Sequence, residues 1–211
     1  MKIYFLLLLV MGLLLYKGII SSLFYSPKKI KIISAVALIL MIFRWIALLI
    51  LFITKNQSYL YLLKPLVFTN LIYIPIYGII SVFIFSRDNK IKLKNILLMG
   101  ILLCIAYSIV IYKSSVNINI SGYCGYTIEL QLEAYCYMIL LIINLLFAIK
   151  GIKLFSVIYS NKLGLVLIII SSIITVISVL LTSINTEFAM LLLADISWIT
   201  TMDYGLLRFK R

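Results

Sequence analysis

Four charged residues lie inside long apolar stretches of this sequence: Lys17, Arg44, Asp195 and Asp203. A cation at the centre of a bilayer costs about 2.5–3.5 kcal/mol on insertion scales, so a charge in a membrane-crossing helix normally faces other helices and has a partner. At 1.5 Å per residue, Arg44 would lie about 15 Å and Asp195 about 9 Å from the outer ends of their helices. A long arginine side chain covers that offset. Lys17 and Asp203 both fall in the inner third, so we predict two intramembrane charge pairs, Arg44 with Asp195 and Lys17 with Asp203.

The sequence leaves two roles open for these pairs. In the structural role they lock helices together, and Lys17 and Asp203 reach toward the cytoplasmic interface. In the functional role Arg44 and Asp195 line a polar cavity, where they bind a charged solute or relay a proton.

A polar stripe follows the third apolar stretch. Its members recur at spacings that place them on one helical face: Asn70, Tyr73, Tyr77 and Ser81. Pro75 lies in the same helix and should kink it, because proline removes one backbone hydrogen bond. Such a stripe is usually a helix-packing surface in membranes. The functional alternative is a substrate path that includes Arg44 and Asp195.

The usual catalytic and metal-binding sequence patterns are missing. The chain has no histidine and no Cys-x-x-Cys spacing, which removes the commonest general base and the usual zinc patterns. Asp195 and Asp203 are eight residues apart, about 12 Å along a helix, which is too far to share a proton directly. We predict no metal site and no cofactor, and the sequence argues against an enzyme.

Cys124 and Cys136 flank the second half of a polar segment, residues 114–134. In an oxidising compartment they could form a disulfide that pins this segment to the helix after it. The alternative is two unrelated thiols, since connectivity cannot be deduced from spacing.

The composition predicts an all-α, polytopic transmembrane helix bundle. The chain has 211 residues, of which 65% are hydrophobic and 12% charged, with a mean hydropathy of +1.23. A soluble domain is roughly 45–50% apolar and about a quarter charged. We therefore expect one integral membrane domain, residues 1–211. The net charge of +13 does not indicate nucleic acid, because the cations lie mostly in short loops between apolar runs, where they face anionic lipid.

Seven stretches approach the roughly 20 residues needed to cross a bilayer. They are Ile3–Leu23, Ile32–Thr54, Leu66–Ser86, Ile96–Tyr112, Tyr135–Phe155, Leu163–Ser183 and Ala189–Leu207. The last one holds both aspartates, so six spans are the alternative.

The segment 114–134 sets the orientation of the chain. It contains no lysine or arginine and separates the first four spans from the last three. A long loop without cations is expected outside the cytoplasm. That choice places thirteen cations inside and four outside, with the N-terminus outside and the C-terminus in the cytoplasm.

Three functional classes remain at this point. A small transporter or permease subunit would explain the intramembrane charges. A membrane sensor, immunity or accessory module would act by helix packing with a partner protein or a second copy. A membrane enzyme on lipid or envelope substrates would need a reactive group not visible here. The abundance of Ile, Lys and Asn with short loops suggests a bacterial cytoplasmic membrane, by association alone.

Overall fold

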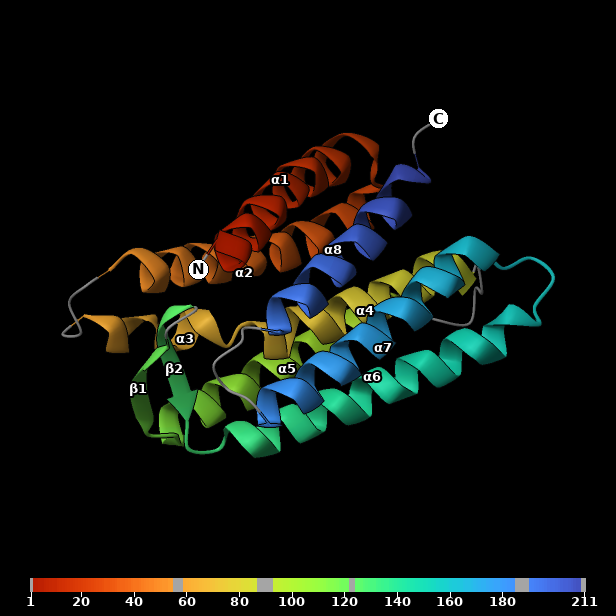
Figure 1. The fold of residues 1–211 in the computed structure, drawn as a ribbon. Helices are drawn as coiled ribbons and strands as arrows, with labels where there is room; N and C mark the ends of the chain where they lie inside the picture. The colour runs from red at the N-terminus through yellow and green to blue at the C-terminus, as the bar shows by residue number, and fades with distance from the viewer. Residues whose placement is uncertain (1, 55–58, 87–92, 122–123, 185–189, 210–211) are drawn as a thin grey trace.

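The computed structural model describes the whole chain except residues 1, 55–58, 87–92, 122–123, 185–189 and 210–211. The described residues form a helix bundle with a small β-hairpin at one end (Figure 1). The prediction of an all-α bundle is confirmed. The helices and strands are α1 (Lys2–Tyr25), α2 (Lys28–Ile53), the 3₁₀ helix η1 (Leu60–Leu63), α3 (Lys64–Val67), α4 (Asn70–Ser86), α5 (Leu93–Lys113), β1 (Val116–Ser121), β2 (Gly125–Leu130), α6 (Glu133–Phe155), α7 (Lys162–Ile184) and α8 (Leu191–Leu207).

Five helical segments in the described part of the chain are long and apolar enough to cross a membrane. They are Lys2–Tyr25, Ile30–Ile53, Leu60–Ser86, Glu133–Phe155 and Lys162–Ser183. The described apolar part of α5, Leu98–Lys113, is shorter, and α8 has 17 residues with two aspartates. Large apolar side chains remain exposed along the outer helices, for example Leu13 of α1 and Ile139 of α6. Exposed apolar surface on this scale suits contact with lipid, as expected of a membrane-embedded protein.

The helices α4 and α8 form the centre of the bundle. Most residues of both helices are buried. α8 packs against α1, α4 and α7, and α4 packs against α2, α5, α6 and α7 as well. Trp198 of α8 is fully buried; its indole nitrogen donates to the Thr175 hydroxyl at 2.9 Å, and its ring meets Phe147 edge-on. Polar groups on the inner faces are therefore held in a tightly packed interior.

The third predicted span is not one continuous helix. The prediction was Leu66–Ser86, but the helix is interrupted at Phe68 and Thr69, between α3 and α4. Pro75 lies inside α4, so the interruption is not at the proline. Thr69 accounts for it in part, because its hydroxyl donates to the Leu66 carbonyl at 2.9 Å and so competes with the helical backbone pattern.

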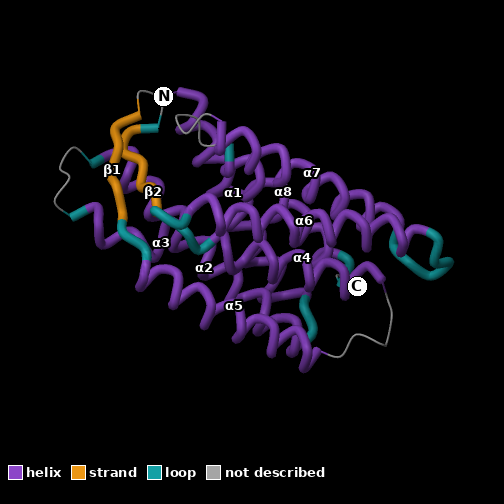
Figure 2. The backbone as a smooth tube through the Cα atoms, turned by 90° about the horizontal axis from the view of Figure 1, so that it is seen from below, coloured by secondary structure: helices purple, strands orange, loops and turns teal. Residues whose placement is uncertain are grey.

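The segment 114–134 is a β-hairpin rather than an irregular loop. Strands β1 and β2 are antiparallel, with Val116 opposite Leu130 and Ser121 opposite Gly125. The hairpin lies at the same end of the bundle as the N-terminus, whereas the C-terminus lies at the other end (Figures 1 and 2). β2 packs against α2. Gly125 has φ +80°, and a Cβ there would come within 2.9 Å of the Leu51 carbonyl oxygen, so the hairpin meets the end of α2 directly.

Candidate functional site

A buried ion pair joins α2 to α8. The Nε of Arg44 donates to Oδ2 of Asp195 at 2.9 Å, and the two side chains are only 4% and 0% exposed. The hydroxyl of Tyr73, on α4, donates to the other carboxylate oxygen at 2.5 Å. Both oxygens of Asp195 are therefore satisfied, as a charge in an apolar interior requires.

The interruption between α3 and α4 lies against this ion pair. In a continuous helix the Val67 carbonyl would accept from the amide of Leu71, but that amide donates instead to Phe68 at 3.1 Å. The Val67 carbonyl accepts from Nη1 of Arg44. Arg44 thus binds an unwound backbone carbonyl and a carboxylate at once.

The two carbonyls before Val67 are also capped by side chains. Leu66 accepts from the Thr69 hydroxyl, and Pro65 accepts from the hydroxyl of Tyr107 on α5. Three consecutive backbone acceptors are therefore satisfied without helical hydrogen bonds. Non-helical backbone at membrane depth is tolerated only where it is buried in protein or lines a polar cavity.

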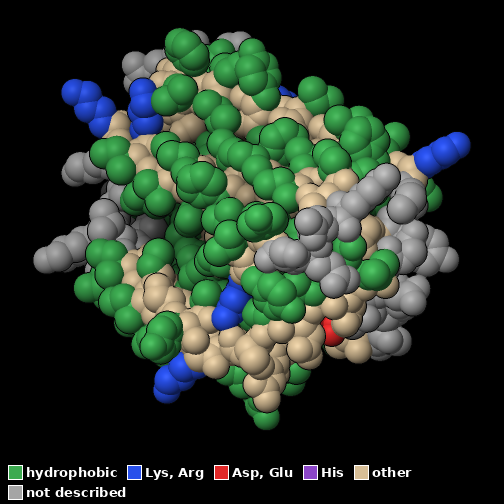
Figure 3. Space-filling model, turned by 90° about the vertical axis from the view of Figure 1, so that its left-hand side faces the viewer, with side chains coloured by type: hydrophobic (Ala, Val, Ile, Leu, Met, Phe, Trp, Pro, Cys, Tyr) green, Lys and Arg blue, Asp and Glu red, His purple; other side chains and the backbone are tan. Residues whose placement is uncertain are grey.

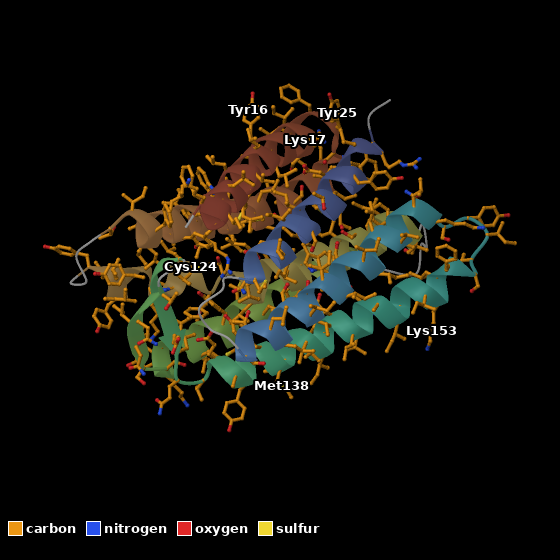
Figure 4. All side chains as sticks on the ribbon, in the orientation of Figure 1. Tyr16, Lys17, Tyr25, Cys124, Met138 and Lys153 are labelled. Atoms are coloured by element: carbon orange, nitrogen blue, oxygen red, sulfur yellow. The ribbon has the colours of Figure 1, made fainter. Side chains whose placement is uncertain are left out.

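A pocket of about 90 Å³ lies between the hairpin and the bundle and reaches Arg44. Val67 and Phe68, at the helix interruption, form part of its wall. Its polar lining comes from Tyr4, Arg44, Tyr126, Thr127, Glu129, Glu133, Tyr137 and Thr182. The Glu133 carboxylate accepts from the amide of Leu130 at 3.0 Å, which joins the start of α6 to the end of β2. Cys124, labelled in Figure 4, lies at the hairpin end and lines the same pocket.

Figure 3 shows the molecule from the end where the N-terminus and the hairpin lie. Hydrophobic side chains cover much of this face, and few charged side chains are visible among them.

The structure does not join Lys17 to Asp203. Lys17 is exposed on α1 (Figure 4), whereas Asp203 is 3% exposed, and neither of its carboxylate oxygens has a hydrogen-bond partner among the described residues. The residue of α1 that faces Asp203 is Gly18: a Cβ there would lie 2.7 Å from Oδ1. Successive helical residues point about 100° apart, so Lys17 is turned away from α8 when Gly18 faces it.

The four residues of the predicted polar stripe are all buried on α4. Tyr73 is part of the ion-pair site. Tyr77 contacts the Met41 sulfur through its hydroxyl at 3.6 Å, and its ring centroid lies 5.6 Å from that of Tyr73. The side-chain polar atoms of Asn70 and Ser81 have no partner among the described residues. None of these four is among the described residues that line the pocket beside Arg44.

The predicted alternative of a Cys124–Cys136 disulfide is not present. Both cysteines are buried thiols, and they line different pockets. Cys124 lies in the hairpin turn, and the six residues of β2 separate it from the strand end near α6. A six-residue strand spans about 20 Å, whereas a disulfide needs Cα atoms less than about 7 Å apart.

Several residues of the site were not predicted from the sequence. The pocket residues Glu133 and Tyr137, and Tyr107 at the helix interruption, were not assigned to it. One usable signal was the alternation of Val116-Asn-Ile-Asn-Ile-Ser121, which is typical of a strand. This alternation predicts a strand, and a strand here suggests a hairpin that brings Glu129 to the end of the bundle.

No group of three or more histidine, cysteine, aspartate or glutamate residues that could hold a metal occurs in the described ranges. No protein-family model matches the chain, and no curated protein matches it in sequence.

Proposed function

We propose that this protein is a multi-pass membrane protein that binds a small solute in the pocket beside Arg44, as a transporter or permease subunit would. The observation that carries the proposal is that three features meet at one place. Arg44 belongs to the ion pair and to the pocket lining, and it donates to the Val67 carbonyl at the helix interruption, which also lines the pocket. Interrupted helices and buried charges mark substrate sites in many transporters, because unwound carbonyls and fixed charges coordinate the solute.

The charges around the pocket favour a cationic solute. Arg44 is offset by Asp195, and the other charged residues among the described lining are Glu129 and Glu133, both acidic. The rings of Tyr4, Tyr126 and Tyr137 also line the pocket, and aromatic faces attract cations. The volume of about 90 Å³ is small, so the pocket suits a compact group such as an ammonium.

In this proposal the hairpin end faces the outside of a bacterial cytoplasmic membrane. The hairpin contains no lysine or arginine, whereas Lys28, Lys153 and Arg208 belong to turns or ends at the opposite side of the bundle. This distribution follows the positive-inside rule. A solute would then enter the pocket from the external side.

The test uses Cys124 as a native reporter of the pocket. With Cys104 and Cys136 replaced by alanine, the thiol of Cys124 is titrated with a cationic and an anionic methanethiosulfonate of similar size. We expect faster reaction with the cationic reagent. Glu133→Gln should lower the ratio of the cationic to the anionic rate, because it removes one negative charge from the pocket lining.

The matched control places a single cysteine at Ile120, which is 72% exposed on the hairpin. In a background without the three native cysteines, Ile120→Cys should show a smaller preference between the two reagents. Equal rates at Cys124 for both reagents, or no effect of Glu133→Gln, would contradict a cation-binding pocket.

A second candidate function rests on a different surface. A groove of about 460 Å³ runs between α2 and α5. One wall carries Gly100, Cys104 and Ser108, a small-residue stripe at intervals of four, and a Cβ on Gly100 would meet nothing closer than Ile76 at 4.0 Å. Small residues allow close helix approach in membranes, so we propose that a second copy of the chain packs here if the protein acts as a sensor or accessory module.

Cys104 tests this alternative, because its thiol lines the groove and is exposed. Oxidation of membranes that contain the Cys124→Ala, Cys136→Ala variant should produce a cross-linked dimer. A monomer by mass measurement in lipid nanodiscs, together with no cross-link, would exclude packing of two copies at this groove.

A further inference from the structure

The carboxyl group of Asp203 is buried between the helices and has no hydrogen-bond partner among the residues that the structure describes. Asp203 is 3% exposed, and neither of its carboxyl oxygens forms a hydrogen bond with any described residue. Asp195, two turns earlier on the same helix, has a partner for each oxygen. The two aspartates of α8 therefore sit in opposite chemical environments.

Groups near Asp203 include residues of α1, α2 and α4, with Leu38 of α2 beside Gly18 at this place. The backbone of α1 approaches the carboxyl at Gly18, where a Cβ would lie 2.7 Å from Oδ1. Lys17 is exposed on α1, and Tyr77 of α4 lies close enough to interact electrostatically with both aspartates of α8. Lys17 also interacts with Asp203 electrostatically but forms no ion pair with it among the described contacts.

An ionised carboxylate in this position would form no ion pair with any described residue. The cost of burying an isolated ion is so large that such groups neutralise instead of staying charged. We propose that Asp203 carries a proton in the resting protein and is a proton-binding site. The proton has a short route, because Asp203 lies four residues before the end of α8 at Leu207, about 6 Å from the helix end.

If the proposed transport function holds, Asp203 is also where a proton couples to solute movement; this part rests on that proposal. Tyr73 contacts Asp195, and its ring packs on that of Tyr77. Loss of the Asp203 proton would place a second negative charge on α8 beside Tyr77. Deprotonation of Asp203 would then shift Tyr77, and through the packing of its ring on Tyr73 it would weaken the Tyr73–Asp195 hydrogen bond.

Dicyclohexylcarbodiimide tests for the proton directly, because it dissolves in lipid and adds to protonated carboxyl groups. Membranes that contain the full chain are treated at pH 6.5, 7.5 and 8.5, and the label is located by peptide mass spectrometry. We expect about one label per chain on Asp203, less label as the pH rises, and none in Asp203→Asn. Asp195→Asn should keep the label, because Asp195 is ion-paired.

A second measurement does not depend on reagent access. The infrared spectrum of the wild-type protein minus that of Asp203→Asn should contain the C=O stretch of a protonated carboxylic acid. Absence of that band at neutral pH overturns the proposal, and so does protection of Asp203 from the reagent by sodium chloride but not by choline chloride, which would assign the site to sodium. Neither result would change the preference of Cys124 for the cationic reagent. The Asp203 proposal and the proposed solute pocket can therefore be disproved independently.

Discussion

The Nε of Arg44 lies 2.9 Å from Oδ2 of Asp195, although 151 residues separate the two in sequence. The helices that carry them, α2 and α8, are bridged by α1 and α4, each of which packs against both. The ion pair therefore closes a four-helix cluster from inside. Its removal should affect the packing of all four helices.

Removal of one partner should destabilise the protein more than removal of both. Arg44→Met leaves the Asp195 carboxylate buried without its counter-charge, which typically costs about 3–5 kcal/mol. The double variant Arg44→Met, Asp195→Leu should recover much of this loss, since a buried pair replaced by apolar groups is often nearly neutral. Thermal unfolding in detergent would rank the stabilities of the wild-type protein, Arg44→Met and the double variant. A double variant no more stable than Arg44→Met would contradict the energetic coupling.

Tyr73→Phe should destabilise the protein by about 1.5–3 kcal/mol, because hydrogen bonds to charged groups contribute about that much. The matched control is Tyr77→Phe. Tyr77 is equally buried on α4, but the partner found for its hydroxyl is the Met41 sulfur, a weak acceptor. Its loss should cost less than about 1 kcal/mol. Equal losses of stability in the two variants would show that the Tyr73–Asp195 bond contributes little.

Thr69→Val should loosen the helix interruption. The substitution keeps the side-chain shape but removes the hydroxyl that donates to Leu66 and, at 3.2 Å, to Leu40 of α2. We expect a loss of about 1 kcal/mol and faster hydrogen exchange at the amides of residues 69–72. Thr200→Val is the control, since that exposed hydroxyl donates only within its own helix, to Ser197. Unchanged exchange in Thr69→Val would mean that other contacts hold the interruption.

Gly125→Ala should displace the hairpin from α2. The alanine would adopt φ +80° and its Cβ would press on the Leu51 carbonyl, and a left-handed residue costs about 1–2 kcal/mol for a side chain before any clash. The expected result is faster thiol modification at Cys124, which the hairpin tip carries. Gly100→Ala has open space around the added Cβ and should be neutral or slightly stabilising. No change at Cys124 in Gly125→Ala would show that the tip is not held by this contact.

The helices could be predicted because their causes are local. Runs of Leu, Ile and Val, such as Leu163–Ser183, are apolar over enough residues to specify membrane-length helices regardless of what they pack against. Pro27, which directly precedes α2, also marks the boundary between α1 and α2 in the sequence. The expected depths of Arg44 and Asp195 came from counting residues along two helices, which is also local information.

The geometry of the candidate site could not be predicted, because it depends on contacts between segments that are distant in sequence. No local pattern shows that Arg44 reaches the Val67 carbonyl, because that acceptor exists only where the third span is interrupted. Lys17 and Asp203 share a depth but not a facing direction, and rotation about a helix axis is decided by packing, here by the close approach of α1 at Gly18. Tyr73 became the third member of the site because α4 runs between α2 and α8.

The sequence by itself determined that this is a bundle of apolar helices with a few charges that need partners, because hydrophobicity and helix length act within each segment. Only the tertiary structure decided that Arg44 pairs with Asp195, whereas the buried carboxyl of Asp203 has no hydrogen-bond partner in the part of the chain that the structure describes. The physical reason is that burial and pairing are properties of the space between helices. That space is set by side chains from four or more segments at once.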